Sequence, residues 1–505
     1  MKYPISVPAG GVALRWPWES ISLAPAAVAV LGFVLRHWGL LAALAVTVLV
    51  HAPTLDYFFE GDDFVVLGSV EYLGPGRYIA DSFLMRDIVP NWRPLTAVVY
   101  AAEWQAFGLN AGAWRATNLA LHLGSMAVLY AIVLRLSARP GIAGGAALIF
   151  GISGAHFDTV TYITALPHVL ATFLTLCSLL AIVSYARDGE RTPAAFVLAF
   201  GLFVLAFLAN EGAFVYAPVL VGAYALYGVR WRRSPLLLVL HAAPFVALAS
   251  GWLAFYETCS CEQLKFDGYS WGPHVFDNYA LYTSWIVFPA RAIPLNPDGL
   301  RWFLAGGVTV FGLFYAVRGP HLARLAVLGT ALALLPFVPV EIWTASRYTY
   351  AAVAFFAPLA ALAGYALYDG VRRTRPFVRI PATVLALLFV ATAGSLWGWQ
   401  TYAQNFQGGE RADRWELLVN ELQRNYESVP PGTTIYISGG PWTNPMEQYT
   451  WVPSVARALY GDVAAFSLPA EQYRKNPPDT RNALFLEWTP DGLRPVPAEQ
   501  LLRAP

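Results

Sequence analysis

Charged side chains are scarce in this chain. Only 13% of its 505 residues are charged, whereas 57% are hydrophobic. Apolar runs recur through about the first 400 positions, which excludes a soluble protein of this length. Acidic and basic residues nearly cancel to a net charge of +1, so no basic surface indicates binding to nucleic acid. The composition therefore predicts a protein that crosses a membrane several times.

Cysteine is also rare. The chain has three cysteines, which do not form a disulfide framework. Cys177 lies in an apolar run, and Cys259 and Cys261 are too close in sequence to pair without strain. Aromatic residues are frequent instead. The 18 Trp and 26 Tyr are typical of the belts that proteins form at membrane–water interfaces.

The apolar runs predict an all-α polytopic membrane protein with about 11 spans. Arginines cluster in alternate loops, for example at 230–233 and 372–375, and the positive-inside rule places these loops in the cytoplasm. We therefore expect a cytoplasmic segment over 1–36, a membrane domain over 37–400 and an external soluble domain over 401–505. The expected spans are 37–55, 116–136, 141–155, 160–185, 194–209, 212–229, 235–255, 302–318, 322–341, 347–369 and 378–399.

Two segments outside the bilayer are expected to be structured. The first external loop, at about 56–115, has apolar residues at helical spacing over 94–109, which predicts an amphipathic surface helix. The C-terminal segment predicts a small α/β domain on the external side. Its patterns are a helix near 415–426, a strand at 433–438, a short helix at 454–460 and a strand at 483–488.

An acidic pair follows the first apolar run, in Phe58-Phe59-Glu60-Gly61-Asp62-Asp63-Phe64. Adjacent carboxylates resist ionising together, so the pKa of one should rise towards a value useful for accepting a proton. The alternative is a solvated loop in which an aspartate caps the next helix.

Other polar residues fall at the same membrane face under this topology. They are Asn118, His122, His156, Asp158, His168, Asn210, Glu211, Glu341 and Arg347. Ionisable groups at membrane depth usually face a cavity or each other, so their convergence predicts a polar cavity. Each also has an ordinary explanation. Asn118 and His122 could join helices, and Arg347 could anchor the chain to lipid headgroups.

Several short motifs follow one another along the chain. They are Gly61-Asp62-Asp63, Trp92-Arg93-Pro94-Leu95, Phe107-Gly108-Leu109-Asn110, Asn118-Leu119-Ala120-Leu121-His122, the run from His156 to Ile163, Asn210-Glu211 and Arg347-Tyr348. Their order resembles the GT-C membrane glycosyltransferases, especially the branch of the protein O-mannosyltransferases and related bacterial enzymes. The chain departs from that pattern at Phe157, where Pro is common, and at Asn210, where a Lys is usual.

The resemblance implies a helical bundle with a cavity open to the exterior of a bacterial plasma membrane. The donor would be a sugar on a polyprenyl phosphate, with no nucleotide sugar, and the acceptor would be a protein, lipid or glycan of the cell envelope. Asp62, the first of the pair, would be the catalytic base, and Asp63 would tune it or orient the acceptor. Arg347 would bind the phosphate. The remaining candidates for substrate binding are Arg93, Asn118, His122, His156, Asp158, His168, Glu211 and Tyr348.

The reaction is compatible with the residue types themselves. Inverting transfer needs a carboxylate to take the proton of the acceptor hydroxyl. It also needs a cation for the departing phosphate, which Arg binds in bidentate geometry. We expect no cofactor, although a Mn or Mg ion held by Asp63, His156 and Glu211 is an alternative. Three other functions stay open: a lipid or sugar transporter, a polysaccharide ligase or polymerase with a lipid-diphosphate donor, and a structural membrane subunit.

Overall fold

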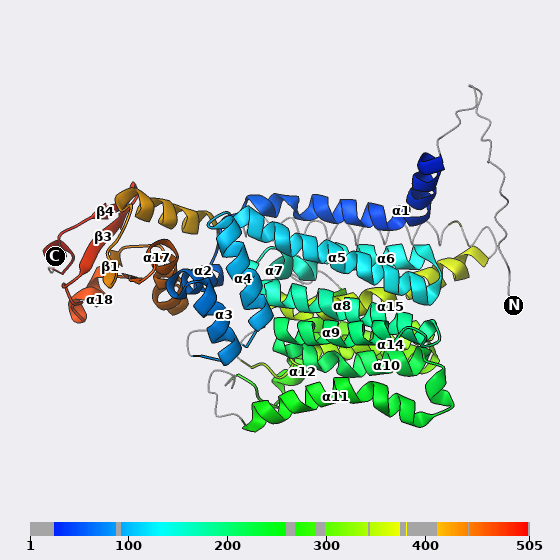
Figure 1. The fold of residues 1–505 in the computed structure, drawn as a ribbon. Helices are drawn as coiled ribbons and strands as arrows, with labels where there is room; N and C mark the ends of the chain where they lie inside the picture. Colours follow the sequence, from blue (N-terminus) through cyan, green and yellow to red (C-terminus); the bar gives the residue numbers. More distant parts are fainter. Residues whose placement is uncertain are drawn as a thin grey trace.

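The computed structural model describes residues 25–86, 92–258, 268–287, 298–341, 344–373, 380, 412–442 and 444–502. In this part of the chain, a bundle of long helices carries a small α/β domain at one end (Figure 1). The fold is mostly helical, as the sequence predicted. The expected span 378–399 and much of the expected segment 1–36 lie outside the described residues.

Six of the described helices are long and apolar enough to cross a membrane. They are α1 (Pro25–His51), α5 (Ala111–Ser137), α8 (Leu166–Arg187), α11 (Pro235–Thr258), α13 (Asp298–Arg318) and α15 (Tyr350–Arg373). Four shorter apolar helices accompany them: α6 (Pro140–Gly151), α9 (Pro193–Ala209), α10 (Ala217–Tyr227) and α14 (His321–Leu334). The six long helices identify an integral membrane protein with several spans, which is a coarser result than the expected count of about 11.

Two expected spans begin as 3-10 helices. Ile163–Ala165 (η3) precedes α8, and Glu211–Tyr216 (η4) precedes α10. Pro167 stands in the first turn of α8, where it has no N–H with which to extend the α-helix backwards. Thr164, within the first of these 3-10 turns, donates its backbone N–H to Oδ1 of Asp63 at 3.1 Å, so this turn lies against the acidic pair.

The expected loop at 56–115 is largely helical. It contains η1 (Ala52–Asp56), α2 (Asp62–Leu73), α3 (Pro75–Leu84) and α4 (Pro94–Phe107). The helix α4 occupies almost the whole range in which the spacing predicted a helix. The sequence of α2 and α3 mixes polar and apolar residues, and neither helix was expected. A further helix, α12 (His274–Val287), lies between the expected spans 235–255 and 302–318.

The arginine-bearing loops gather at the other end of the bundle. Arg135, in the last turn of α5, pairs with Asp188 at 2.6 Å. The carboxylate of Glu190 accepts the backbone N–H of Arg230 at 3.0 Å, which joins the loops that follow α8 and α10. The 27 residues of α5 separate these contacts from the Asp62 end of the bundle by about 40 Å, at ~1.5 Å per residue.

The C-terminal domain is built on a four-stranded sheet with the order β2-β1-β3-β4. Strand β1 pairs in parallel with β2 and β3, and β3 pairs antiparallel with β4. The elements after the helix at 412–425 are β1 (Thr433–Ser438), a π-helix η7 (Glu447–Trp451), α17 (Val452–Tyr460), β2 (Val463–Leu468), α18 (Ala470–Lys475), β3 (Ala483–Thr489), β4 (Gly492–Pro495) and α19 (Ala498–Leu502). The domain lies beside α2 and α3 (Figure 1).

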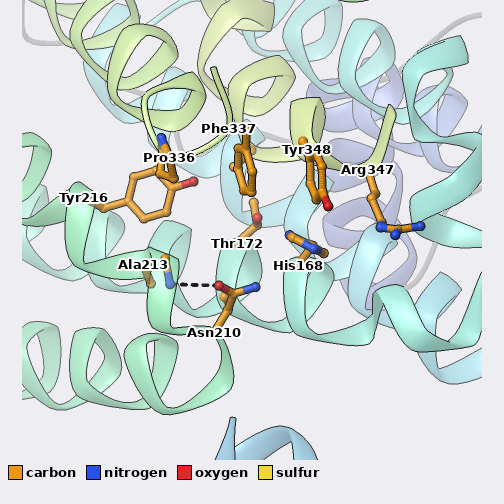
Figure 2. Close-up of a pocket in the computed structure, with 12 residues that line it drawn as sticks. His168, Thr172, Asn210, Ala213, Tyr216, Pro336, Phe337, Arg347 and Tyr348 are labelled. Atoms are coloured by element: carbon orange, nitrogen blue, oxygen red, sulfur yellow. Dashed lines mark hydrogen bonds between the residues drawn. The ribbon is translucent and has the colours of Figure 1, made fainter. Parts of the chain in front are cut away.

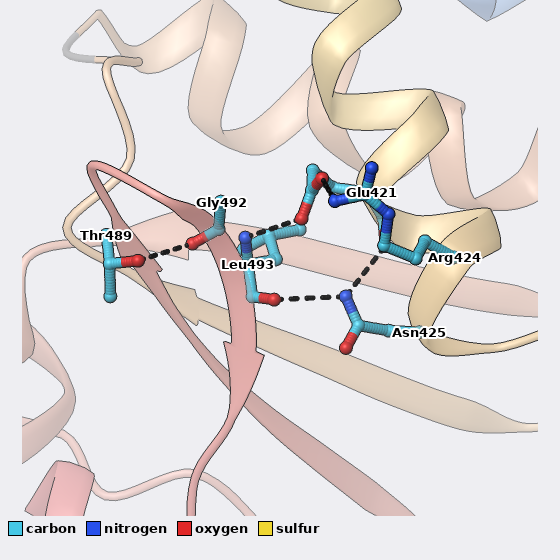
Figure 3. A network of polar contacts seen from close by, with 6 residues as sticks. All are labelled: Glu421, Arg424, Asn425, Thr489, Gly492 and Leu493. Carbon is cyan, nitrogen blue, oxygen red and sulfur yellow. Dashed lines mark hydrogen bonds and ion pairs between the residues drawn. The ribbon is translucent and has the colours of Figure 1, made fainter.

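Polar contacts fix the helix at 412–425 to the edge strand β4 (Figure 3). The buried carboxylate of Glu421 accepts the backbone N–H of Leu493 at 2.9 Å. The amide of Asn425 donates to the carbonyl of Leu493 at 3.0 Å. Trp415 and Leu418 lie on the buried face of the same helix, as their spacing predicted. The domain is therefore a packed unit.

Candidate functional site

A cavity of about 470 Å³ opens at the Asp62 end of the bundle. Its walls come from α2, α3, α4, the start of α8, the segment before α15 and the C-terminal domain. The lining residues are Asp62, Val65, Val66, Ser69, Tyr78, Ser82, Arg93, Thr96, Ala97, Tyr100, Thr164, Pro167, His168, Arg347, Tyr348, Met446 and Thr450. Five of the residues predicted for the site thus line one cavity: Asp62, Arg93, His168, Arg347 and Tyr348.

The two carboxylates of the acidic pair have different environments. Asp62 is half-buried and lines the cavity. Its Oδ1 accepts the indole N–H of Trp451 at 2.8 Å, and its backbone N–H donates to the hydroxyl oxygen of Tyr162 at 3.0 Å. Both aspartates stand in the first turn of α2, where negative charge is favoured by the helix dipole. Asp62 is the member of the pair that a substrate in the cavity can reach.

Asp63 is fully buried and holds two loops together. Its Oδ2 accepts the backbone N–H of Glu60 at 3.1 Å, and its Oδ1 accepts that of Thr164 at 3.1 Å. Burial raises the pKa of Asp63 to about 7, although the nearby Arg115 acts in the opposite direction. The carboxylate therefore fixes the acidic loop against the segment that precedes α8.

Gly61 allows the close approach of three segments at this point. Its φ is +52°, a conformation that favours glycine. A Cβ atom at this position would lie 3.3 Å from the ring of Trp451 and 3.3 Å from the hydroxyl of Tyr162. The acidic loop, the segment before α8 and the C-terminal domain therefore meet around a residue without a side chain.

Arg93 and Glu211 form a two-pronged ion pair. The Nε and Nη2 atoms of Arg93 donate to the two carboxylate oxygens of Glu211, each at 2.9 Å. Both side chains are about a quarter exposed, at 24% and 27%. The pair links the start of α4 to the turn after α9, so two motifs that are 118 residues apart meet at one contact.

Arg347 is the cation of the cavity that has no carboxylate partner among the described residues. Its guanidinium lies 5.6 Å from the ring centres of Tyr162 and Tyr348. Tyr348 stacks on Phe337 with 4.4 Å between ring centres, and the ring of His168 lies 5.8 Å from that of Tyr348. Figure 2 shows Arg347, Tyr348 and His168 side by side at a second, narrow pocket of about 20 Å³.

Three of the predicted residues are placed deeper in the bundle and are not among those that line the cavity. The amide of Asn118 donates to the carbonyl of Tyr162 at 3.1 Å, so it supports the loop that holds Asp62. His122 is buried between the hydroxyl of Tyr350, at 2.8 Å, and the carbonyl of Gly151, at 3.1 Å. The ring of His156 lies 5.3 Å from that of His122.

Asp158 belongs to the short helix α7 (Phe157–Val160), but its side chain lies outside the described atoms. The alternative metal site of Asp63, His156 and Glu211 is not formed. In the part of the chain that the structure describes, no three His, Cys, Asp or Glu side chains are close enough to hold a metal ion. Asp63 instead accepts backbone N–H groups, and Glu211 pairs with Arg93.

Sequence reasoning missed two residues that organise the site. Arg115 is buried and donates to the carbonyls of Thr161, at 2.9 Å, Phe58, at 2.7 Å, and Tyr57. An arginine beside the start of an apolar run was a signal that could have identified it, because such a charge needs internal partners. Trp451 had no comparable signal, since it lies 389 residues from Asp62 in a different domain.

Comparison with known proteins identifies the fold. No protein-family model and no curated protein matches the sequence. Apo ArnT from Cupriavidus metallidurans has a TM-score of 0.53 and 14% identity, over 92% of this chain and 94% of that chain. The same protein bound to undecaprenyl phosphate has a TM-score of 0.50 and 11% identity, over 89% of this chain and 93% of that chain.

The oligosaccharyltransferase from Archaeoglobus fulgidus, tethered to an acceptor peptide, has a TM-score of 0.51 and 12% identity. The match covers 85% of this chain but 64% of that chain, so this chain spans less than two thirds of the archaeal protein. Both structures are of the GT-C type. The chain therefore has the GT-C fold that the order of its sequence motifs predicted.

Proposed function

We propose that the protein is an integral-membrane glycosyltransferase that moves a sugar from a polyprenyl-phosphate donor to an acceptor hydroxyl. One observation carries this proposal: a carboxylate, Asp62, and a cation without a carboxylate partner, Arg347, line the same cavity at one end of the bundle. Transfer from a lipid phosphate needs both charges: the carboxylate takes the proton of the acceptor hydroxyl, and the cation stabilises the departing phosphate.

The reaction is an inverting displacement at the anomeric carbon. The acceptor oxygen attacks this carbon while Asp62 takes the hydroxyl proton. The bond from the anomeric carbon to the phosphate oxygen breaks, and its electron pair leaves with the polyprenyl phosphate. Arg347 stabilises the charge on this leaving group through two parallel N–H bonds. The product is a glycoside of inverted configuration.

The neighbouring side chains would shape the sugar site. Glu211 neutralises the charge of Arg93, and the Arg93 side chain lines the wall of the cavity. The rings of His168 and Tyr348 offer flat surfaces and hydrogen-bonding groups of the kind that bind sugar hydroxyls. Asn118, His122 and His156 would act indirectly. Asn118 donates to the carbonyl of Tyr162, whose hydroxyl contacts Asp62, and the rings of His122 and His156 lie against Tyr350.

The similar structures support a lipid-phosphate donor. ArnT was solved with undecaprenyl phosphate, and the archaeal oligosaccharyltransferase was solved with a dolichol phosphate. We extend this class of donor to the present chain because the cavity combines Arg347 with the apolar side chains of Val65 and Val66. The acceptor would enter the same cavity and present its hydroxyl to Asp62.

We further propose that the Asp62 end faces the exterior of a bacterial plasma membrane. In this arrangement the segment 1–36 is cytoplasmic, the domain over 37–400 crosses the bilayer about 11 times and the domain over 401–505 is external. The concentration of arginines at the opposite end of the bundle supports this orientation.

The test of the proposal is Asp62→Asn, assayed for transfer from a radiolabelled polyprenyl-phosphate sugar. We expect the rate to fall by about 10²–10⁴-fold, as for the loss of a general base. Glu71→Gln is the matched control: Glu71 lies on the same helix and also accepts an indole N–H, from Trp104 at 3.0 Å, but it is exposed. Turnover close to wild type in Asp62→Asn would refute the assigned mechanism.

A further inference from the structure

The C-terminal domain reaches the cavity through a single turn. Met446 and Thr450, on either side of the start of the π-helix η7, line the cavity wall. The next residue, Trp451, donates its indole N–H to Oδ1 of Asp62 at 2.8 Å. Single π-helical turns are rare and often occur at functional sites. The C-terminal domain therefore contacts Asp62, which is the carboxylate that lines the cavity among the described residues.

Polar contacts hold this turn in place. Glu447 is buried, and its carboxylate accepts from the guanidinium of Arg414 at 2.7 Å. Its backbone N–H donates to Oδ1 of Asn444 at 2.9 Å. The amide of Gln448 donates to the carbonyl of Trp442 at 2.9 Å. These bonds fix the start of the turn that presents the Trp451 side chain to Asp62.

The domain is also packed along the helix that Asp62 begins. A Cβ atom at Gly68 in α2 would lie 2.7 Å from the carbonyl oxygen of Ser454, so only glycine permits this approach of α17. One turn further along, the guanidinium of Arg457 lies 5.6 Å from the ring centre of Tyr72. The contact between Trp451 and Asp62 is thus one end of a continuous interface.

We propose that Trp451 is a positioning residue for Asp62, so that the C-terminal domain completes the catalytic site. Its N–H occupies Oδ1 and fixes the rotation of the carboxylate, and Oδ2 is left to take the proton of the acceptor hydroxyl. Among the described residues, no other side chain donates to this carboxylate. The inference rests on the proposed function in one respect, the role of Asp62 as base.

Trp451→Phe tests the role, because it removes the N–H and keeps an aromatic ring. Loss of a hydrogen bond to a charged group predicts a fall in kcat of about 10- to 100-fold. KM for the donor should stay unchanged, because Arg347 is untouched. Trp442→Phe is the matched control. Trp442 is buried in the same domain, and its indole N–H has no partner in the described structure, so both constants should stay near wild type.

Three kinetic results would overturn the inference. The first is wild-type kcat in Trp451→Phe. The second is an equal fall in kcat in Trp442→Phe, which would indicate a general effect on the domain. The third is a loss expressed only in KM for the donor, which would place Trp451 in donor binding instead.

A second measurement does not depend on activity. The indole N–H groups of the 18 tryptophans can be isotope-labelled for NMR in detergent, and the signals missing from Trp451→Phe and Trp442→Phe identify these two residues. Asp62→Ala should shift the Trp451 signal and leave that of Trp442 in place. An unmoved Trp451 signal would refute the contact. If the wild-type protein transfers no sugar, the proposed function fails, and a shifted signal would still show that the domain docks on Asp62.

Discussion

Arg347 provides the sharpest test of donor binding. Its guanidinium is half-buried at the cavity and has no carboxylate partner among the described residues, unlike that of Arg93. We expect it to bind the donor phosphate through two N–H bonds. The competing explanation is an anchor to lipid headgroups, in which only the positive charge matters. Substitution by Lys and by Ala separates the two, because Lys keeps the charge but loses the fork.

The expected loss of affinity follows from the number of bonds. Each hydrogen bond to a charged group contributes roughly 1.5–3 kcal/mol, and about 1.4 kcal/mol is tenfold in affinity. Arg347→Ala removes two bonds and should weaken donor binding about 10²–10⁴-fold. Arg347→Lys keeps one and should weaken it about 10- to 100-fold. The contacts with Tyr162 and Tyr348 add about 0.5–1 kcal/mol each, and we expect their loss to lower stability.

The assay is the apparent affinity for a polyprenyl-phosphate sugar in detergent, where the bilayer surface is absent. Arg77→Ala is the control, since Arg77 lies on α3 at the same end, is 63% exposed and pairs with Asp81. Its affinity should match wild type. An Arg347→Ala protein with unchanged affinity, or an Arg347→Lys protein that binds as tightly as wild type, would refute bidentate binding of the phosphate.

Two further predictions concern topology and pH. In intact cells, the cysteine of Arg232→Cys should be protected from an impermeant thiol reagent, because this loop is expected to be cytoplasmic. A cysteine introduced in the exposed part of the C-terminal domain should react. The reverse pattern of labelling would contradict the proposed orientation. Burial raises the pKa of Glu103 in α4 to about 7, so its carboxyl binds a proton more tightly in the folded state than in the unfolded one. Stability should therefore fall as pH rises from about 4.5 to about 7, and Glu103→Gln should remove up to about 3 kcal/mol of this loss. Thermal unfolding in detergent should show a stabilised Glu103→Gln protein at about pH 8 and no gain at about pH 4, and a gain equal at both values would contradict this explanation.

The helices were the most predictable part of the molecule. Long apolar runs produce long helices whatever surrounds them, because every backbone polar group in a bilayer must be bonded within its own segment. The run expected at 116–136 lies within α5, and the strand expected at 433–438 coincides with β1. The helices α2 and α3 were missed, because their sequences mix polar and apolar residues without a clear helical period. Their structure depends on packing, of α2 against the C-terminal domain and of α3 against α4.

The candidate site was predictable in its residue types and less so in its contacts. The alternation of loops placed Asp62, Arg93 and Arg347 at one end, and the structure brings them to one cavity. The bidentate contact of Arg93 with Glu211 was not predicted, although both residues were candidates. Spacing along a sequence does not indicate which side chains meet across 118 residues. The same holds for the contact between Trp451 and Asp62, which belong to different domains.

The acidic pair shows why the environment of a residue decides its role. Repulsion between neighbouring carboxylates was expected to raise one pKa and so mark the proton acceptor. The raised pKa belongs to Asp63, and its largest cause is burial. Both oxygens of Asp63 already accept backbone N–H groups, so this carboxyl cannot meet a substrate. Asp62 lines the cavity and accepts the indole N–H of Trp451 with one oxygen, which makes it the better candidate for the base on grounds of access. The shifted pKa thus belongs to the residue that fixes the loop, and accessibility is the reason for which we propose Asp62 as the base.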